Sequence, residues 1–502
     1  MLVDFRPHAR LRSSAPVSVA DSIGPVVDAL SESPTDLARV RVVCDWVQYR
    51  HNFRGVVEVR PILPTDGADP AGTPPHGPVP EGVRDDDLEI AVDVRRGGET
   101  ALRDATREVL RAHAEGAEAG DVVLEDWGPT RRSVIWDFNA LYWSALDLWE
   151  EATGTAYEQA LPGGESDARN RDAVRAVLAE LFTVWDGLVD RGALPPELYV
   201  VEIGVGDGHQ AQVFLDELRE LDARHGRGYY RRLHYLMCDY SPHVLARARA
   251  TVADHAEHVS SFVTDATSPR DVLGFLQFKV FLIYISNVYD NLPSDEVAQL
   301  GGRTYLVESR AFLPADAAAE LAALVGVRTD ELAGLVATLL RLGPALLAEA
   351  QPGRFPDTAA AVDFWRRTWA AVRLAERYVG LAGLDLYDLS PTVNGEALRP
   401  LLESGADLRM HVSNGAVASF TETIGLLHPY GRLVCHDLFA RDVGAYRTGF
   451  RGPGKYDGSV VNWVNGPLLA HLGRRRGVDV TYTPFAHRAG TNIVTMTAQV
   501  RD

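Results

Sequence analysis

The sequence predicts an α/β protein built on an open, mostly parallel sheet, with an α+β module before the sheet and a helical insertion within it. Two observations predict this fold class. From Leu198 onward, short apolar strands alternate with helical segments, as in parallel sheets. Between Leu313 and Gly383 an Ala/Leu-rich helical block replaces this pattern, and alternation then resumes up to Arg501. The helical block therefore interrupts the sheet in sequence.

A chain of 502 residues is too long for one hydrophobic core, so several domains are expected. We predict an α+β module over residues 1–125 and a helical lead-in over 126–196. The sheet domain comprises residues 197–310 and 406–502, and the helical insertion, a candidate lid or substrate subdomain, covers residues 311–405.

The charge pattern narrows the choice of partners. The formal net charge is −19, and no segment gathers Lys and Arg into a basic stripe, so nucleic-acid binding is not expected. An acidic surface instead favours a cationic substrate, though weakly. We see neither an apolar run of about 20 residues nor an N-terminal export signal. A cytoplasmic protein without membrane contact is the resulting expectation.

Cysteine and lysine are both rare. Cys44, Cys238 and Cys435 are far apart in apolar segments, which indicates buried thiols and argues against disulfides and cysteine-based zinc sites. No metal site is predicted. The only lysines, Lys279 and Lys455, lie in no context typical of imine-forming enzymes. Preference for Arg over Lys suggests a bacterial source.

The N-terminal module has no recognisable chemistry. Residues 40–47 and 55–59 are β-rich, and residues 61–83 are dense in Pro and Gly, which is typical of a loop. Residues 88–94 alternate as in a half-buried strand, and residues 99–118 have helical spacing. We expect a packing or dimerisation domain, so a homodimer is one interpretation.

Two aromatic clusters are expected to be core. The first, in the lead-in, consists of Trp136, Phe138, Tyr142, Trp143 and Trp149. The second spans residues 364–369 of the insertion and is followed by Arg373, Arg377 and Tyr378. A lid for an anionic or aromatic substrate is the alternative for the second cluster, but such a stripe is more typical of a packed helix face with arginines directed outward.

Residues 198–208 carry the strongest signal. An apolar strand runs directly into a turn containing Gly204, Gly206 and Gly208, and residues 210–221 read as a helix. Glycines let the backbone bend tightly and let a ligand approach the main-chain N–H groups at a helix start. This arrangement predicts a ligand site at the turn.

Two details distinguish the ligands that such a turn binds. His209 stands where the dinucleotide fingerprint has its third glycine. Glu202, two residues before Gly204, would repel a phosphate. S-adenosylmethionine has no phosphate and carries an ammonium and a sulfonium. We therefore predict S-adenosylmethionine as the cofactor, held in part by Glu202 and the three glycines.

The following strands end in polar side chains. The second strand ends in Asp239, followed by Tyr240, and this acid is placed to accept hydrogen bonds from both ribose hydroxyls. The third ends in Asp265 and Ala266, which we expect at the adenine amino group and ring. The fourth ends in Asn287. Because ligands of open parallel sheets bind at strand carboxyl ends, these residues predict one shared site.

In order and spacing, Glu202, the glycine turn, Asp239 and Asp265 resemble class I S-adenosylmethionine-dependent methyltransferases. The resemblance covers residues 197–310 and 406–502 and implies a Rossmann-like sheet. It also implies that the two strands read near residues 478–485 and 492–498 finish this sheet as a hairpin with an antiparallel last strand.

A narrower likeness concerns residues 286–293, Ser-Asn-Val-Tyr-Asp-Asn-Leu-Pro. They are similar to the Asn-Glu-x-x-Asp-Ala-Leu-Pro element of the MidA-like family, relatives of the mitochondrial complex I assembly methyltransferase. This likeness implies a helical insertion before the fifth strand and arginine methylation on a protein. Val288 replaces the family's glutamate, which would help to hold a guanidinium, and Asn291 replaces its alanine.

Methyl transfer from a sulfonium requires alignment of the nucleophile, exclusion of water and, for a protonated nucleophile, removal of a proton. Asn287 is predicted to orient the nucleophile and Asp290 to accept a proton or pair with a cation, with Tyr289 as a wall of the pocket. His436, at the end of the fifth strand, is a candidate general base. The alternative for His436 is a structural role.

These observations favour transfer of a methyl group to a nitrogen or oxygen nucleophile. Protein arginine, through the MidA-like resemblance, and a small molecule of bacterial natural-product biosynthesis both remain as acceptors. A nicotinamide-dependent oxidoreductase is disfavoured by Glu202 and His209. A third alternative is a non-catalytic assembly protein that retains the cofactor-binding fold.

Overall fold

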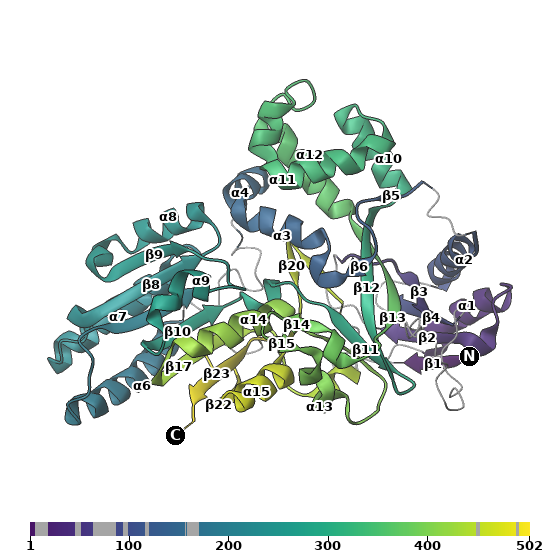
Figure 1. Ribbon diagram of the computed structural model, residues 1–502. Coiled ribbons are helices and arrows are strands. Elements are labelled where there is room, and N and C mark those ends of the chain that lie inside the picture. Colours follow the sequence, from purple (N-terminus) through teal and green to yellow (C-terminus); the bar gives the residue numbers. More distant parts are fainter. Residues whose placement is uncertain are drawn as a thin grey trace, which may run out of the picture.

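The protein is described by a computed structural model in which two large sheets lie side by side, with a group of helices above them (Figure 1). The structure describes residues 1–5, 19–45, 52–63, 87–93, 99–115, 120–155, 157, 170–447, 452–487 and 491–501. Most of the Pro/Gly-rich segment predicted as a loop, from residue 64 on, lies outside these residues.

The first sheet has seven strands in the order β22-β23-β17-β10-β7-β8-β9. Its strands are β7 (Leu198–Ile203), β8 (Leu233–Asp239), β9 (Val259–Val263), β10 (Val280–Ser286), β17 (Leu427–Asp437), β22 (Val478–Pro484) and β23 (Val494–Val500). The pairings from β9 to β17 are all parallel, whereas β23 runs antiparallel to β17 and to β22. This order confirms the predicted Rossmann-like sheet with its antiparallel last strand.

Helices cover both faces of this sheet, because successive side chains of a buried strand point to opposite faces. Val200 packs with α6 (Arg171–Asp190), α7 (His209–His225) and α8 (Pro242–Thr251). Val201 and Ile203 pack on the other face with α14 (Asn414–Thr423) and α15 (Gly466–Arg475). Cys238 and Cys435 lie buried in this domain and Cys44 lies buried in the other sheet, which confirms the prediction of buried cysteines.

The second sheet joins the start of the chain to the insertion, and its main path is β1-β2-β4-β3-β13-β12-β11-β16. These strands are β1 (Leu2–Phe5), β2 (Val40–Asp45), β3 (Val57–Leu63), β4 (Leu88–Asp93), β11 (Glu296–Leu300), β12 (Arg303–Leu313), β13 (Arg373–Gly380) and β16 (Leu408–His411). Helices α1 (Val19–Ser31) and α2 (Glu99–Glu115) pack on its N-terminal part.

The observed division differs from the predicted one. Residues 296–313 form β11 and β12 of the second sheet rather than the end of the first, and the insertion also contributes β13 and β16, so it is not purely helical. The N-terminal module is not separate either, since β3 pairs in parallel with β13. All six residues of β4 are buried, not every second one.

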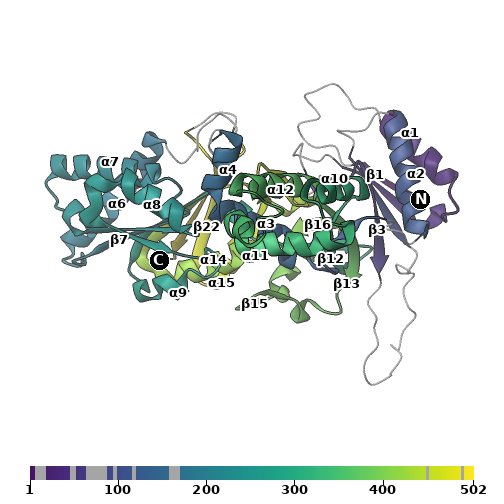
Figure 2. The same cartoon turned by 90° about the horizontal axis from the view of Figure 1, so that it is seen from above.

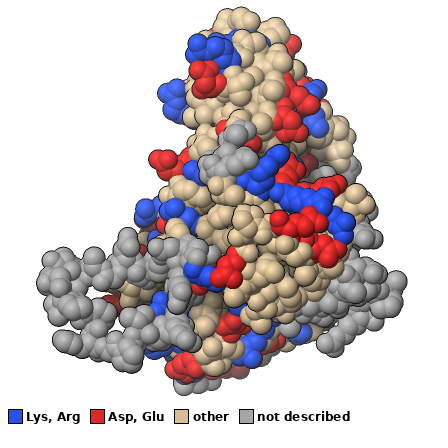
Figure 3. Space-filling model, turned by 90° about the vertical axis from the view of Figure 1, so that its right-hand side faces the viewer, with Lys and Arg blue, Asp and Glu red and all other residues tan. Residues whose placement is uncertain are grey.

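Buried charges join the two parts of the second sheet. Glu376 of β13 accepts hydrogen bonds from Arg54 near the N-terminal strands and from Arg409 of β16. Arg60 of β3 donates to Glu89 of β4 at 2.9 Å. Breaking such a pair leaves an uncompensated buried charge. On the outer face of this region, acidic and basic side chains are interspersed (Figure 3).

The helices above the sheets are α10 (Ala315–Val325), α11 (Leu332–Ala350) and α12 (Thr358–Ala371), beside α3 (Ile135–Ser144) and α4 (Leu146–Thr153) (Figure 2). Phe364, Trp365 and Trp369 of α12 are buried, which confirms packing as the role of that cluster. Residues 329–350 are long and apolar enough to cross a membrane by length and composition alone. They are bent at Gly343, and α11 packs against α12.

Candidate active site

The glycine turn connects β7 to α7, and each glycine has a positive φ. A Cβ atom on Gly204 would lie 2.3 Å from Cγ2 of Val288, and one on Gly206 would lie 2.8 Å from the hydroxyl of Tyr157. A Cβ on Gly208 would lie 2.8 Å from the main chain of Ala248 in α8. The turn therefore requires glycine for its backbone shape and for close approach.

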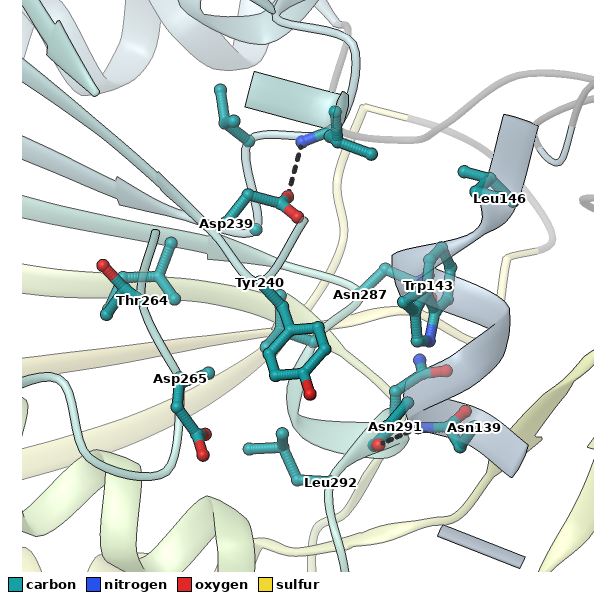
Figure 4. A pocket seen from close by; sticks show the side chains of 18 of the residues that line it. Asn139, Trp143, Leu146, Asp239, Tyr240, Thr264, Asp265, Asn287, Asn291 and Leu292 are labelled. Carbon is teal, nitrogen blue, oxygen red and sulfur yellow. Dashed lines mark hydrogen bonds between the residues drawn. The ribbon is translucent and has the colours of Figure 1, made fainter. Parts of the chain in front are cut away.

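A cavity of about 460 Å³ opens at the carboxyl ends of β7, β8 and β10, beneath α3. Of the predicted cofactor residues, those that line it are Glu202, Gly204, Gly206, Asp239, Tyr240, Asp265, Ala266 and Asn287. Gly208 does not line it and serves the packing of α7 against α8 instead. In Figure 4, Tyr240 lies between Asp265 on one side and Asn139 and Trp143 on the other.

Asp239 is fixed by the main chain. One carboxylate oxygen accepts the N–H of Gly206 at 3.3 Å and the other accepts the N–H of Ser241 at 3.0 Å. Burial raises the pKa of Asp239 to about 6, although these bonds favour its ionised form. Ser241 caps α8 through the N–H of Val244. Since Ser241 supplies the cap, the remaining lone pairs of Asp239 are available to a ligand.

Glu202 is buried and lines the cavity. Its Oε2 accepts a hydrogen bond from the hydroxyl of Tyr235, with 2.6 Å between the two oxygens. Burial raises the pKa of Glu202 to about 8, with smaller contributions from Asp207 and Asp239. At neutral pH the side chain is therefore mostly protonated until a cation lies beside it.

Asp265 lies in the turn that follows β9. One of its oxygens accepts both the main-chain N–H and the hydroxyl of Thr267 at 2.8 Å. This local turn holds the carboxylate at the edge of the cavity, next to Ala266. From this position Asp265 can contact one end of a ligand that binds along the strand tips.

Asn287 turns the chain sharply after β10. Its φ of 54° is in the left-handed region, which asparagine tolerates, and its N–H donates to the carbonyl of His436. The N–H groups of Val288 and Tyr289 donate to Asp437 at 3.1 and 2.8 Å. The turn brings Asn287 and Val288 to the cavity and directs the next two residues away from it.

Three of the predicted catalytic residues do not line the cavity. Tyr289 and Asp290 are buried behind it, and burial raises the pKa of Asp290 well above its usual range. Because Asp290 does not reach the cavity, we correct its role from proton acceptor to positioning. His436 is buried as well, with Nδ1 3.0 Å from the hydroxyl of Thr495 and its ring beside Phe485. Its placement fits the structural alternative.

The opposite wall comes from α3, which the sequence indicated only as core. Trp136, Asp137, Ala140 and Trp143 share one helix face and line the cavity. Asn139 donates to the carbonyl of Asn291 at 3.0 Å, a bond drawn in Figure 4, and accepts the N–H of Val460. The helical spacing of the aromatic residues indicated that one face of this helix is buried. It does not distinguish a face that lines a cavity from one that packs in a core.

Two arginines also border the cavity, and both are paired. Arg247 of α8 forms an ion pair with Glu150 at 3.1 Å. Arg131 lies 3.5 Å from Asp295 and stacks on the ring of Tyr387. Tyr157 completes the wall above Gly206. The side of the cavity formed by α3 and Tyr157 is therefore aromatic, and the two arginines at its border are already paired.

Comparison with known proteins gives structural likeness at low sequence identity. A candidate methyl transferase from Burkholderia thailandensis, bound to S-adenosyl-homocysteine, is 14% identical, with 78% of this chain and 90% of that chain covered and a TM-score of 0.43. The 1,6-didemethyltoxoflavin-N1-methyltransferase of the same organism is 11% identical, with 71% and 89% covered and a TM-score of 0.31.

The methyltransferase CcbJ from Streptomyces caelestis is 10% identical, with 73% of this chain and 99% of that chain covered and a TM-score of 0.32. No family model matches the chain, and no curated protein matches it by sequence.

Proposed function

We propose that the protein is an S-adenosylmethionine-dependent methyltransferase whose acceptor binds between the strand tips and α3. One observation carries the proposal. The glycine turn after β7, Asp239 at the tip of β8, Asp265 after β9 and Asn287 after β10 border a single cavity. In an open parallel sheet this edge is where ligands bind.

The charges of the cavity fit this cofactor better than a dinucleotide. Asp207 lies within the glycine turn, where its carboxylate would repel a pyrophosphate and attract an ammonium or a sulfonium. Glu202 becomes a second carboxylate there when a cation lies beside it. Asp239 has lone pairs left for ribose hydroxyls, and Asp265 and Ala266 are placed for an adenine. When bound, S-adenosylmethionine supplies a methyl group activated by its sulfonium.

The chain's own groups position the acceptor and exclude water. Asn287 offers an amide at the strand tip to orient a nucleophile, while Val288 and Leu292 present apolar surface beside it. Trp136 and Trp143 close the opposite side from α3. Positioning of this kind supplies a large part of the rate enhancement when little covalent chemistry is needed. The acceptor atom is a nitrogen or an oxygen.

Ligand binding tests the cofactor. We expect S-adenosyl-homocysteine, but not NADH, to raise the melting temperature of the protein. Asp239→Asn should weaken this binding about tenfold or more, since a charged hydrogen bond to the ligand is lost. Asp254→Asn, an exposed residue outside the cavity, is the control. Stabilisation by NADH instead would point to an oxidoreductase.

Turnover separates an enzyme from a non-catalytic assembly protein. With isotopically labelled S-adenosylmethionine and bacterial extract, we expect S-adenosyl-homocysteine to accumulate and the label to appear in a product. Mass spectrometry of the labelled product distinguishes a small molecule from a protein arginine. Binding of S-adenosyl-homocysteine without any transfer would favour the non-catalytic alternative.

A further inference from the structure

The cavity has an acceptor wall that is distinct from its cofactor wall. The cofactor wall comprises the tips of β7, β8 and β10, whereas α3 supplies the opposite side. Residues 136, 140 and 143 recur at helical spacing, and Asp137 follows Trp136 on the side of α3 that lines the cavity. An acceptor bound opposite the cofactor therefore meets two indole rings and one carboxylate.

Asp137 differs from the other charged side chains of the cavity wall, which have ionic or hydrogen-bond partners. Arg131 and Arg247 are paired with Asp295 and Glu150, as described above. Asp207 pairs with the ring of His209, and Asp239 and Asp265 accept hydrogen bonds from nearby turns. Within the described residues, we find no hydrogen bond or ion pair for the carboxylate of Asp137.

Asp137 is an exposed side chain in the first turn of α3, where free main-chain N–H groups favour a negative charge. Partial desolvation of its carboxyl nevertheless raises the pKa of Asp137. Its acidic neighbour Glu125 is already held by the hydroxyl of Ser133 and the N–H groups of Val134 and Ala311, and provides no counter-charge. A cationic ligand that displaces water from the carboxylate of Asp137 would become its ionic partner.

The aromatic residues of the same wall also favour a cationic ligand. Trp136, Trp143 and Tyr157 offer aromatic faces and edges, and a cation over an aromatic face is stabilised by the ring quadrupole. The net charge of −19 also attracts cations to the protein as a whole. An anionic acceptor would meet a carboxylate with no unpaired arginine to offset it.

We propose that the methyl acceptor is a small amine that binds as its ammonium form, with Asp137 as the counter-ion and the indoles of α3 around its apolar part. Before transfer the ammonium loses one proton to the solvent. The freed lone pair then forms the bond to the methyl carbon as the bond from that carbon to sulfur breaks, which leaves S-adenosyl-homocysteine. This inference rests on the proposed function, because it assigns the acceptor end of the same cavity. Asp137 is a substrate-binding residue in this proposal.

Three indole probes with a cationic, a neutral and an anionic end group on the same two-carbon side chain test the assignment. The protein is first saturated with S-adenosyl-homocysteine, and the binding of tryptamine, indole-3-ethanol and indole-3-propionate is then measured by calorimetry. We expect tryptamine to bind most tightly and the carboxylate probe most weakly. Asp137→Asn should weaken tryptamine about ten- to a hundredfold and leave the neutral alcohol unchanged.

The matched control is Asp126→Asn, an exposed carboxylate outside the cavity, which should leave all three affinities unchanged. The inference is overturned if the alcohol or the carboxylate binds as tightly as tryptamine, or if none of the three binds. It is also overturned if Asp137→Asn affects tryptamine no more than the control does. Failure of S-adenosyl-homocysteine itself to bind would overturn the proposed function, so the two failures are distinguishable.

Discussion

Asp290 and Asp437 form a hydrogen-bonded pair of buried carboxyl groups behind the cavity. Asp437 also accepts the main-chain N–H groups of Val288, Tyr289 and Leu438, which favour its ionised form. The shared proton therefore resides on Asp290. The pair holds the segment after β10 against the end of β17. It thereby fixes the positions of Asn287 and Val288 at the cavity.

Substitution separates the roles of the two acids. Asp290→Asn should change the free energy of unfolding by less than about 1 kcal/mol, because an amide N–H replaces the shared proton. Asp437→Asn should cost about 1–3 kcal/mol, because the amide keeps only one accepting oxygen for main-chain N–H groups that now bond to two. Urea unfolding followed by circular dichroism measures both. Loss of methyl transfer in a stable Asp290→Asn variant that still binds S-adenosyl-homocysteine would restore Asp290 as a catalytic residue.

The same pair predicts a pH dependence of stability. Burial raises the pKa of both groups in the folded protein. The contribution of the pair is complete below the ordinary pKa of aspartate, about 4, and is lost as pH rises through the folded pKa of Asp290. The melting temperature of the natural protein should therefore fall relative to that of Asp290→Asn toward alkaline pH. Parallel pH profiles would contradict this prediction.

Cofactor binding should release protons from Glu202. Its pKa is raised to about 8 by burial, and an ammonium beside it would lower that pKa again. At pH 7 we expect binding of S-adenosyl-homocysteine to release close to one proton from this group, and affinity to rise as pH approaches 8. Calorimetry in buffers of different ionisation enthalpy measures the release.

Glu202→Gln is the control for that experiment, because the amide cannot titrate while the amino group of the ligand still does. The difference between the two proteins is the contribution of Glu202. If both release the same number of protons, the ammonium does not lie beside Glu202.

A double-mutant cycle tests the close approach of the turn to the β10 segment. Gly204→Ala should abolish measurable cofactor binding, because the new Cβ would lie 2.3 Å from Cγ2 of Val288 and φ is 78°. In a Val288→Ala background that methyl group is absent, and only the backbone strain of about 1–2 kcal/mol remains. Binding should then recover in part. Additive effects of the two substitutions would show that the contact does not matter.

Much of the cofactor wall is determined locally and was predicted from the sequence. Glu202, Gly204 and Asp239 stand at strand ends, and parallel strands place their carboxyl ends at one edge of a sheet. The alternation of strands and helices likewise predicted a mostly parallel first sheet, and the strand pairings confirm it. These features depend on residues close together in the chain, where periodicity and turn chemistry are informative.

Only the tertiary structure shows that α3 forms the acceptor wall. It alone also shows which of the catalytic candidates face the cavity. Helix α3 lies about 60 residues before β7 in the chain, and its amphipathic spacing is the same whether it faces a core or a cavity. Asp290 and His436 stand at strand ends like Asp239, yet the left-handed turn at Asn287 and the packing of β17 direct both into the interior. Sequence patterns determine which side chains reach an edge, but only long-range packing determines which of them face a ligand, because burial depends on elements distant in the chain.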